Sequence, residues 1–164
     1  SSSAIGADDR PAPPGEYRAD LYRCGCPLDA ARRHAPHLLA ALADAPMTRI
    51  PRHGPRAEII ALSPAMQIPV RHGCSNSHCS VIVGLPGSAR IDVSVGGEPH
   101  GVRDGEAGGG DLSYGIGYAN GGDTEARVLV FDIWHPDLDA AEREALTALL
   151  AAMVDFDTRL QELA

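Results

Sequence analysis

The sequence contains no lysine: all 14 of its basic residues are arginines, set against 22 acidic residues, for a formal net charge of −8. We attribute the absence of lysine to the base composition of a bacterial genome. The arginines are scattered along the chain and form no basic stripe. A nucleic-acid interface needs basic side chains gathered on one face to neutralise phosphates. The sequence therefore predicts no nucleic-acid partner.

Long apolar runs are also absent. No run approaches the roughly 20 residues of a bilayer-spanning helix, and no signal-peptide core precedes a small-residue cleavage site. The hydrophobic content of 44% and charged content of 22% are ordinary for a globular protein. We therefore expect a cytoplasmic protein with no membrane partner.

The four cysteines include no Cys-x-x-Cys motif. Cys24 and Cys26 flank one glycine, and Cys74 and Cys79 form a second pair with a spacing that matches no structural zinc site. In a cytoplasmic protein such cysteines are free, reduced thiols. The role of Cys24 and Cys26 stays open.

The chain is long enough for one domain with a hydrophobic core. Residues 1–16 lack periodicity and are predicted to form a flexible arm before a single domain over 17–164. Short apolar runs separated by Gly, Pro and Asn predict strands typical of an antiparallel sandwich or barrel. These runs are 58–62, 80–84, 90–95, 111–116 and 128–133.

Helices are predicted on either side of the strands. The first spans 29–45, with Asp29 as its N-cap, and Pro36 inside it should kink the helix or restart it. The second spans 139–163 and begins with a capping box of Asp139 and Glu142. Its apolar residues recur at helical spacing, and we expect this stripe to pack against a sheet. The alternative is an amphipathic helix that joins two copies of the chain as a homodimer.

Several short motifs occur in a recognisable order: Leu62-Ser-Pro64, Ile68-Pro69, Gly73-x-x-Asn76, Gly84-Leu85, Val95-Gly-Gly-Glu98, Asp111-Leu-Ser-Tyr114 and Asp132-x-Trp-His-Pro136. In this order and near these spacings they resemble the aspartyl/asparaginyl β-hydroxylases, which are iron- and 2-oxoglutarate-dependent oxygenases. The resemblance implies a mainly β double-stranded β-helix, a cupin-like jelly roll, over about 58–134. Flanking N- and C-terminal helices complete the expected fold.

The resemblance also places the family's ligands on this chain. The two iron-binding histidines fall on Arg71, with His72 beside it, and on Ile116. The histidine and arginine that hold 2-oxoglutarate fall on Ile82 and Ser80. Isoleucine has neither a lone pair nor a donor, so it binds neither iron nor a carboxylate.

A further arginine of the family, on the last long strand, falls on Ala126 beside Arg127. A slip of one residue would place Arg127 there, but it would also turn each side chain of the strand to the other face. We therefore expect no cofactor. The alternative is Fe(II) with 2-oxoglutarate, or another transition metal.

Strand alternation predicts which side chains share the interior. His78 and Ser80 should point the same way as Ile82, with Arg71 and Tyr114 facing the same space. The candidate catalytic residues are His78, Arg71, Ser80, Tyr114 and Cys74. The alternative is an inactive core in which Ile82 and Ile116 fill the metal cavity.

Three functions are compatible with these residues. The first is a metal-independent tailoring enzyme, of isomerase, epimerase, cyclase or lyase type, acting on an amino-acid-derived or peptide small molecule. The second is an oxygenase with a rearranged metal site at His72, Cys74 and His78. The third is a non-catalytic binding protein, since fold does not determine function.

Overall fold

The computed structural model describes residues 14–23, 25–50, 54–73 and 75–162. At position 157 and positions 160–162 it describes the backbone alone. The statements below concern these residues. Cys24, His53 and Cys74 lie outside them.

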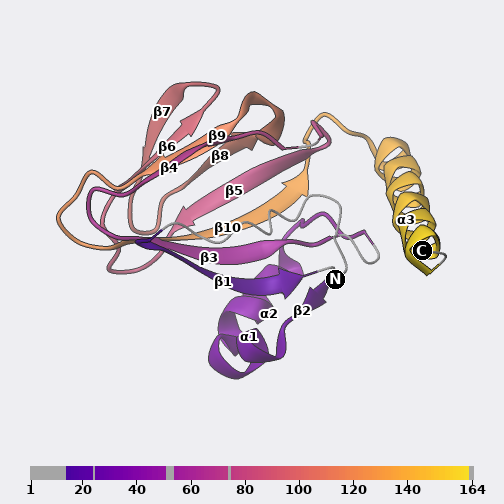
Figure 1. The fold of residues 1–164 in the computed structure, drawn as a ribbon, viewed down its shortest axis with the longest axis horizontal. Coiled ribbons are helices and arrows are strands. Elements are labelled where there is room, and N and C mark those ends of the chain that lie inside the picture. The colour runs from indigo at the N-terminus through magenta and orange to yellow at the C-terminus, as the bar shows by residue number, and fades with distance from the viewer. Residues whose placement is uncertain (1–13, 24, 51–53, 74, 163–164) are drawn as a thin grey trace.

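Two antiparallel sheets face each other (Figure 1). The larger has six strands in the order β2 (Cys26–Pro27), β1 (Glu16–Arg23), β3 (Ala57–Leu62), β10 (Ala126–Trp134), β5 (His78–Gly84) and β8 (Ala107–Asp111). The smaller has four, in the order β4 (Gln67–Arg71), β9 (Ile116–Ala119), β6 (Ile91–Val95) and β7 (Glu98–Val102). This confirms the predicted double-stranded β-helix.

The central strand β10 serves two cores because its side chains alternate between faces. Val128 and Val130 join the apolar cluster between the sheets. Leu129 and Phe131 join a second cluster on the opposite face. There α1 (Asp29–His34) and α2 (Pro36–Asp44) cover the large sheet (Figure 1). The large sheet is therefore buried on both faces.

Several predicted boundaries differ from the structure. In the region predicted as helical over 29–45, Pro36 restarts the helix, which is one of its two expected effects, because proline occupies the first position of α2. Leu28, not Asp29, occupies the N-cap of α1, and Asp29 lies in the first turn. The β structure begins well before residue 58, because β1 pairs along β3.

The strand predicted over 111–116 is wrong. β8 ends at Asp111, and a 3₁₀ turn, η1 (Leu112–Tyr114), follows it. Gly115 then has φ +82°, a left-handed conformation that favours glycine, before β9 begins. The glycine breaks the strand and gives β8 and β9 to different sheets.

The C-terminal helix α3 (Ala140–Glu162) starts as predicted but packs differently. Its capping box is formed: Asp139 Oδ1 accepts from Glu142 N at 2.8 Å, and Glu142 Oε2 accepts from Asp139 N at 2.9 Å. However, α3 stands apart from both sheets (Figure 1), and Leu149 is 56% exposed. The expectation that its stripe packs against a sheet is therefore wrong. None of the described helices is long and apolar enough to cross a membrane.

Asn120 fastens the loop between β9 and β10 to the end of β3. Its side chain is buried, and Nδ2 lies 2.9 Å from Leu62 O, 3.1 Å from Ser63 O and 2.9 Å from Thr124 O. Oδ1 accepts from Gly122 N at 3.0 Å. One amide thus satisfies several backbone groups that an apolar side chain would leave unpaired.

We predict that Asn120→Ala lowers the free energy of unfolding by about 2–4 kcal/mol. The substitution leaves buried backbone groups without a hydrogen-bond partner, and each such group costs about 1–3 kcal/mol. Urea denaturation measures the change. Asn76→Ala removes the same amide from an exposed position and should change stability by less than about 0.5 kcal/mol. Equal effects of the two substitutions would show that Asn120 does not hold the loop.

Candidate functional site

The inner face of the large sheet becomes polar near the end where β5 starts and β10 finishes. Asp132 lies directly opposite Ser80, and Trp134 opposite His78. Residues opposite each other in an antiparallel pair share a face, so these four side chains form a continuous patch. Ser80 Oγ donates a hydrogen bond to Asp132 Oδ1 at 2.6 Å. The alternation predicted for His78, Ser80 and Ile82 is therefore present.

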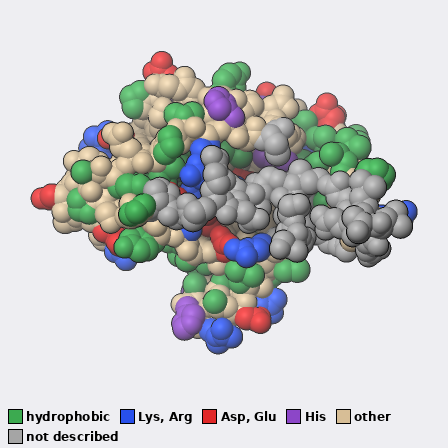
Figure 2. Space-filling model, viewed as in Figure 1, with side chains coloured by type: hydrophobic (Ala, Val, Ile, Leu, Met, Phe, Trp, Pro, Cys, Tyr) green, Lys and Arg blue, Asp and Glu red, His purple; other side chains and the backbone are tan. Residues whose placement is uncertain are grey.

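A charged network continues this patch onto β1 and β3. Glu58 accepts hydrogen bonds from Arg18 Nη1 at 2.9 and 3.0 Å and from Arg56 Nη2 at 2.7 Å. Arg18 Nε also donates to Glu16 Oε1. Burial alone would lower the pKa of Arg18, but the charges of Glu58 and Glu16 outweigh it and raise that pKa. In the middle of this face of the molecule, basic and acidic side chains gather between the two sheets (Figure 2).

Tyr118 reaches the same charged network from the small sheet. Burial raises the pKa of its phenol, and the nearby charge of Glu58 raises it further. The phenol therefore stays neutral and can donate a hydrogen bond. Residues of both sheets thus form one polar layer above the apolar core.

The contacts of the His78 imidazole include a ring stack and a hydrogen bond. Its ring stacks on Trp134 with 5.3 Å between ring centroids and an interplanar angle of 16°. Its Nδ1 lies 2.9 Å from Ser77 Oγ, which lies 2.7 Å from Ser75 Oγ. The neighbours on either side fix the direction of the ring, as an acid–base histidine requires.

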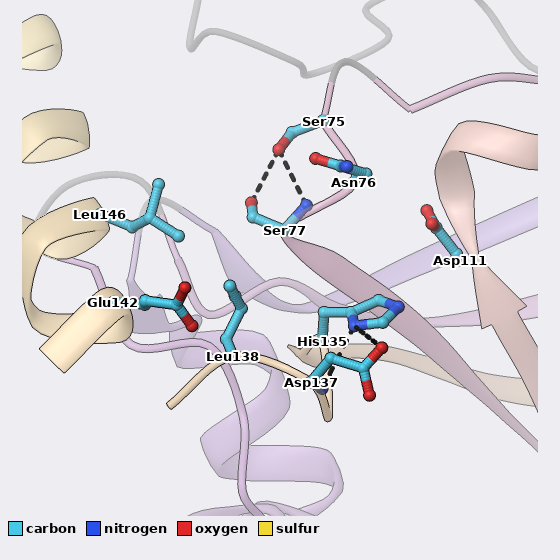
Figure 3. A pocket seen from close by; sticks show the side chains of 9 residues that line it. All are labelled: Ser75, Asn76, Ser77, Asp111, His135, Asp137, Leu138, Glu142 and Leu146. Carbon is cyan, nitrogen blue, oxygen red and sulfur yellow. Dashed lines mark hydrogen bonds and ion pairs between the residues drawn. The ribbon is translucent and has the colours of Figure 1, made fainter. Parts of the chain in front are cut away.

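A pocket of about 500 Å³ lies between the start of β5, the turn after β10 and the first turns of α3 (Figure 3), and it is linked to His78 through Ser77. His135 anchors the turn, because its backbone N donates to Ser77 O at 2.9 Å. Ser77 lines the pocket and also contacts His78, so it joins the pocket to the polar layer. The pocket is lined by Ser75, Asn76, Ser77, Asp111, His135, Asp137, Leu138, Glu142 and Leu146.

Arg71 and Ile116, the two positions that the resemblance assigns to iron, come together as it implies. Arg71 lies directly opposite Ile116 across β4 and β9, after an irregularity in the register that follows Ile68. Arg71 is half-buried and Ile116 is buried at 3% exposure. Arginine is cationic and isoleucine has no donor atom, so this pair does not fit an iron ion.

Ile82 and Ile116 belong to one buried apolar cluster between the sheets. The barrel is therefore packed with apolar side chains at their level. Among the residues that the structure describes, no three His, Cys, Asp or Glu side chains gather closely enough to hold a metal ion.

The remaining predicted residues are more scattered. Tyr114 lies in η1 and is 69% exposed, so the expectation that it faces the interior is wrong. The break at Gly115 takes it out of the strand, and the tyrosine of β9, Tyr118, is the one that is partly buried against the core. His72 is exposed, with Nδ1 3.1 Å from Ser113 O. The proposed ligand and catalytic residue Cys74 lies outside the described residues.

The two described cysteines, Cys26 and Cys79, are free thiols. Burial raises the pKa of the Cys79 thiol, and the nearby carboxylates of Asp111, Asp137 and Asp132 raise it further. The thiol therefore stays protonated near neutral pH and is a poor nucleophile.

Three residues of the polar layer were not among the candidates from the sequence, although strand alternation indicates that they face inward. Glu58 is two residues before Ile60, Asp132 is two after Val130, and Tyr118 is two after Ile116, so each shares the inward face of its strand. No comparable pattern marks Arg18, which reaches the site through a pairing between distant segments. The pocket depends on the placement of α3, which the sequence did not reveal.

Comparisons with known proteins agree with this architecture. A family model described as "Aspartyl/Asparaginyl beta-hydroxylase" matches residues 17–136. No curated protein matches the chain.

Among solved structures, the Cupin_2 domain of an XRE family transcriptional regulator from Enterobacter cloacae superimposes with a TM-score of 0.50. Its identity is 8%, over 74% of this chain and 98% of that chain. A double-stranded β-helix protein from Klebsiella pneumoniae has a TM-score of 0.49 and 10% identity, over 76% and 81% of the two chains. A Cupin 2 conserved barrel protein from Salinispora arenicola has a TM-score of 0.47 and 10% identity, over 81% and 83%.

We predict that Glu58→Gln lowers the free energy of unfolding by about 2 kcal/mol, because it removes the charge that holds two partly buried arginines. The partial exposure of Arg18 and Arg56 keeps this figure below that of a fully buried pair. Chemical denaturation of Glu58→Gln and of a control variant measures this change in the free energy of unfolding. Glu125→Gln is the control: its pair with Arg127 is exposed, and its loss should cost less than about 0.5 kcal/mol. A Glu58 variant as stable as the control would contradict a structural role for the network.

Proposed function

The chain belongs to the aspartyl/asparaginyl beta-hydroxylase family, and we propose that it is an enzyme that moves a proton on a small amino-acid-derived or peptide substrate without iron or 2-oxoglutarate. Isomerases, epimerases, cyclases and lyases act in this way, and such an enzyme would serve as a tailoring step in biosynthesis. The observation that carries the proposal is the setting of His78: a stacked, hydrogen-bonded imidazole at the junction of the polar layer and the pocket.

In this proposal His78 is the general base. When Nδ1 carries its proton and donates it to Ser77 Oγ, the lone pair of the ring lies on Nε2. Ser77 Oγ can at the same time donate to Ser75 Oγ. His78 Nε2 takes a proton from the substrate, and Ser77 and the face of Trp134 stabilise the imidazolium. The imidazolium then gives the proton to another atom of the substrate or to its leaving group.

Arg71 is proposed to hold the substrate's carboxylate. A guanidinium is cationic at every physiological pH and forms paired hydrogen bonds with planar anions. Arg71 is half-buried on the inward face of β4, where an ion pair is less screened than at the surface. A carboxylate held there would also stabilise negative charge that develops on the adjacent carbon when His78 removes a proton.

The iron-free part of the proposal rests on donor chemistry at the ligand positions. Arg71 repels a metal cation, and Ile116 and Ile82 contribute side chains to the apolar core. We derive no step through iron or 2-oxoglutarate for this reason.

A non-catalytic binding protein is the second candidate, and the packing of Ile82 and Ile116 in one apolar cluster favours it. A protein of that kind would keep the pocket and the polar layer for recognition and would have no need of His78 as a base. A third candidate, a rearranged metal site at His72, Cys74 and His78, depends on a cysteine outside the described residues. A stoichiometric metal that is lost in His72→Ala would support it.

Proton transfer has a direct signature in heavy water. We predict that the protein exchanges a carbon-bound hydrogen of its substrate with deuterium when incubated in D₂O with panels of amino acids, N-acyl amino acids and dipeptides, followed by proton NMR. His78→Ala should lower the exchange rate by at least about 100-fold, the usual contribution of a general base. Arg71→Ala should mainly raise KM.

The control for both variants is His100→Ala, which removes an exposed imidazole on β7 and should keep full activity. Circular dichroism verifies that each variant is folded. A compound that binds the protein but undergoes no exchange would support the binding-protein candidate, and full activity in His78→Ala would remove the proposed base.

We predict that Fe(II) and 2-oxoglutarate together do not raise the melting temperature, since a ligand stabilises a folded protein only by binding to it. Differential scanning fluorimetry under nitrogen compares each compound alone with both together. An increase that requires both compounds would contradict the iron-free proposal.

A further inference from the structure

Helix α3 exposes an apolar stripe. Leu149 is 56% exposed, Met153 43% and Phe156 62%, and all three lie on one side of the helix. A groove of about 320 Å³ extends the stripe toward the start of the helix, lined by Leu138, Glu142, Ala145, Leu146 and Leu149. Apolar side chains gather where α3 lies at the end of the molecule (Figure 2). A contiguous patch of this kind is typical of an interaction surface.

The spacing of the stripe specifies the type of partner. Leu146, Leu149, Met153 and Phe156 follow one another at intervals of three, four and three residues. These are the a and d positions of a heptad, the pattern by which one helix packs along another. The stripe therefore fits a second helix better than a sheet or a small molecule.

The stripe is also complementary to itself. Its spacing is the same in both chain directions, so two antiparallel copies place Leu146 opposite Phe156 and Leu149 opposite Met153. Such pairing is isologous, as a two-fold dimer requires. The exposed Ala152 lies near the two-fold axis, where a small side chain lets the helices approach.

Charge complementarity supports the same register. In the antiparallel pair the exposed Arg159 of one copy lies at the level of residues 142–144 of the other, where Glu142 and Glu144 flank Arg143 and leave a net charge of −1. The opposed helix dipoles add a favourable interaction at each end. A parallel pair would instead place each of these residues beside its own copy, with like charges together.

We propose that α3 is a dimer interface, and that its occupant is the antiparallel α3 of a second copy of this chain. Leu138, Glu142 and Leu146 line both the groove and the pocket beside His78. The second copy would thus fix the helix that forms one wall of that pocket. The proposed dimer does not depend on the proposed reaction, so the dimer can be tested without a substrate.

Sedimentation velocity over a range of protein concentrations tests the assembly. The wild-type protein should be a dimer, and Leu149→Glu and Phe156→Glu should each weaken the dimer by at least about 100-fold, as the loss of a central apolar contact does. Ala148→Glu is the matched control: it adds the same charge to an exposed position of the same helix, off the stripe, and should leave the dimer intact. A monomer at every concentration, or a dimer that survives both stripe substitutions, would overturn the proposal.

Oxidative cross-linking tests the direction of the helices. In the antiparallel register the two copies of Ala152 are neighbours, whereas the two copies of Ala145 are about 20 Å apart, from a rise of about 1.5 Å per residue. Ala152→Cys should form a disulfide between copies, identified by mass spectrometry of the linked peptides, and Ala145→Cys should not. A link through position 145 and none through 152 would mean a different arrangement and would sink the antiparallel assignment.

Discussion

The antiparallel register of β3, β10 and β5 determines both the core and the candidate site. Val130 of β10 lies opposite Glu58 on one side and Ile82 on the other, and Asp132 follows it on the same face. The pairing that buries the valine therefore also brings the charged network of β3 next to the Ser80–Asp132 hydrogen bond. A register shifted by one residue would turn every side chain of β10 to the other face, which would remove Val128 and Val130 from the cluster between the sheets and Asp132 from the polar layer.

The polar layer occurs where this packed architecture ends. Below it, the apolar cluster fills the space between the sheets. Above it, the strand ends and the first turns of α3 surround the pocket. Two arginines and two glutamates neutralise one another within the layer, which makes it possible to bury so many charged groups together. His78 stands at the edge of this network rather than within it, in contact with residues of the pocket.

The parts of the fold that could be predicted were those whose sequence pattern is local. β5 and β10 have apolar residues on both faces and were found to within a few residues of their ends. β4 and β7 were missed because most of their side chains are exposed and give no apolar run. Arg71 lies on the same face as Ile116 because the register between β4 and β9 shifts after Ile68, and regular alternation along β4 does not predict such a shift. Tyr114 and Tyr118 are the same residue type four positions apart, and the turn at Gly115 separates the exposed Tyr114 from the partly buried Tyr118.

The packing around Ile82 and Ile116 favours apolar side chains at these positions and disfavours polar ones. An apolar side chain at an inward position is stabilised by the neighbours already there, so exchanging an imidazole for isoleucine leaves the barrel intact. The opposite exchange would place one imidazole among aliphatic side chains with no partner and no room, at a cost of several kcal/mol, by the usual scale for unpaired buried polar groups. Two such exchanges would have to occur together before a metal could compensate for either. The barrel is therefore closed to polar side chains at this level, and the polar groups of the two sheets meet only toward its rim.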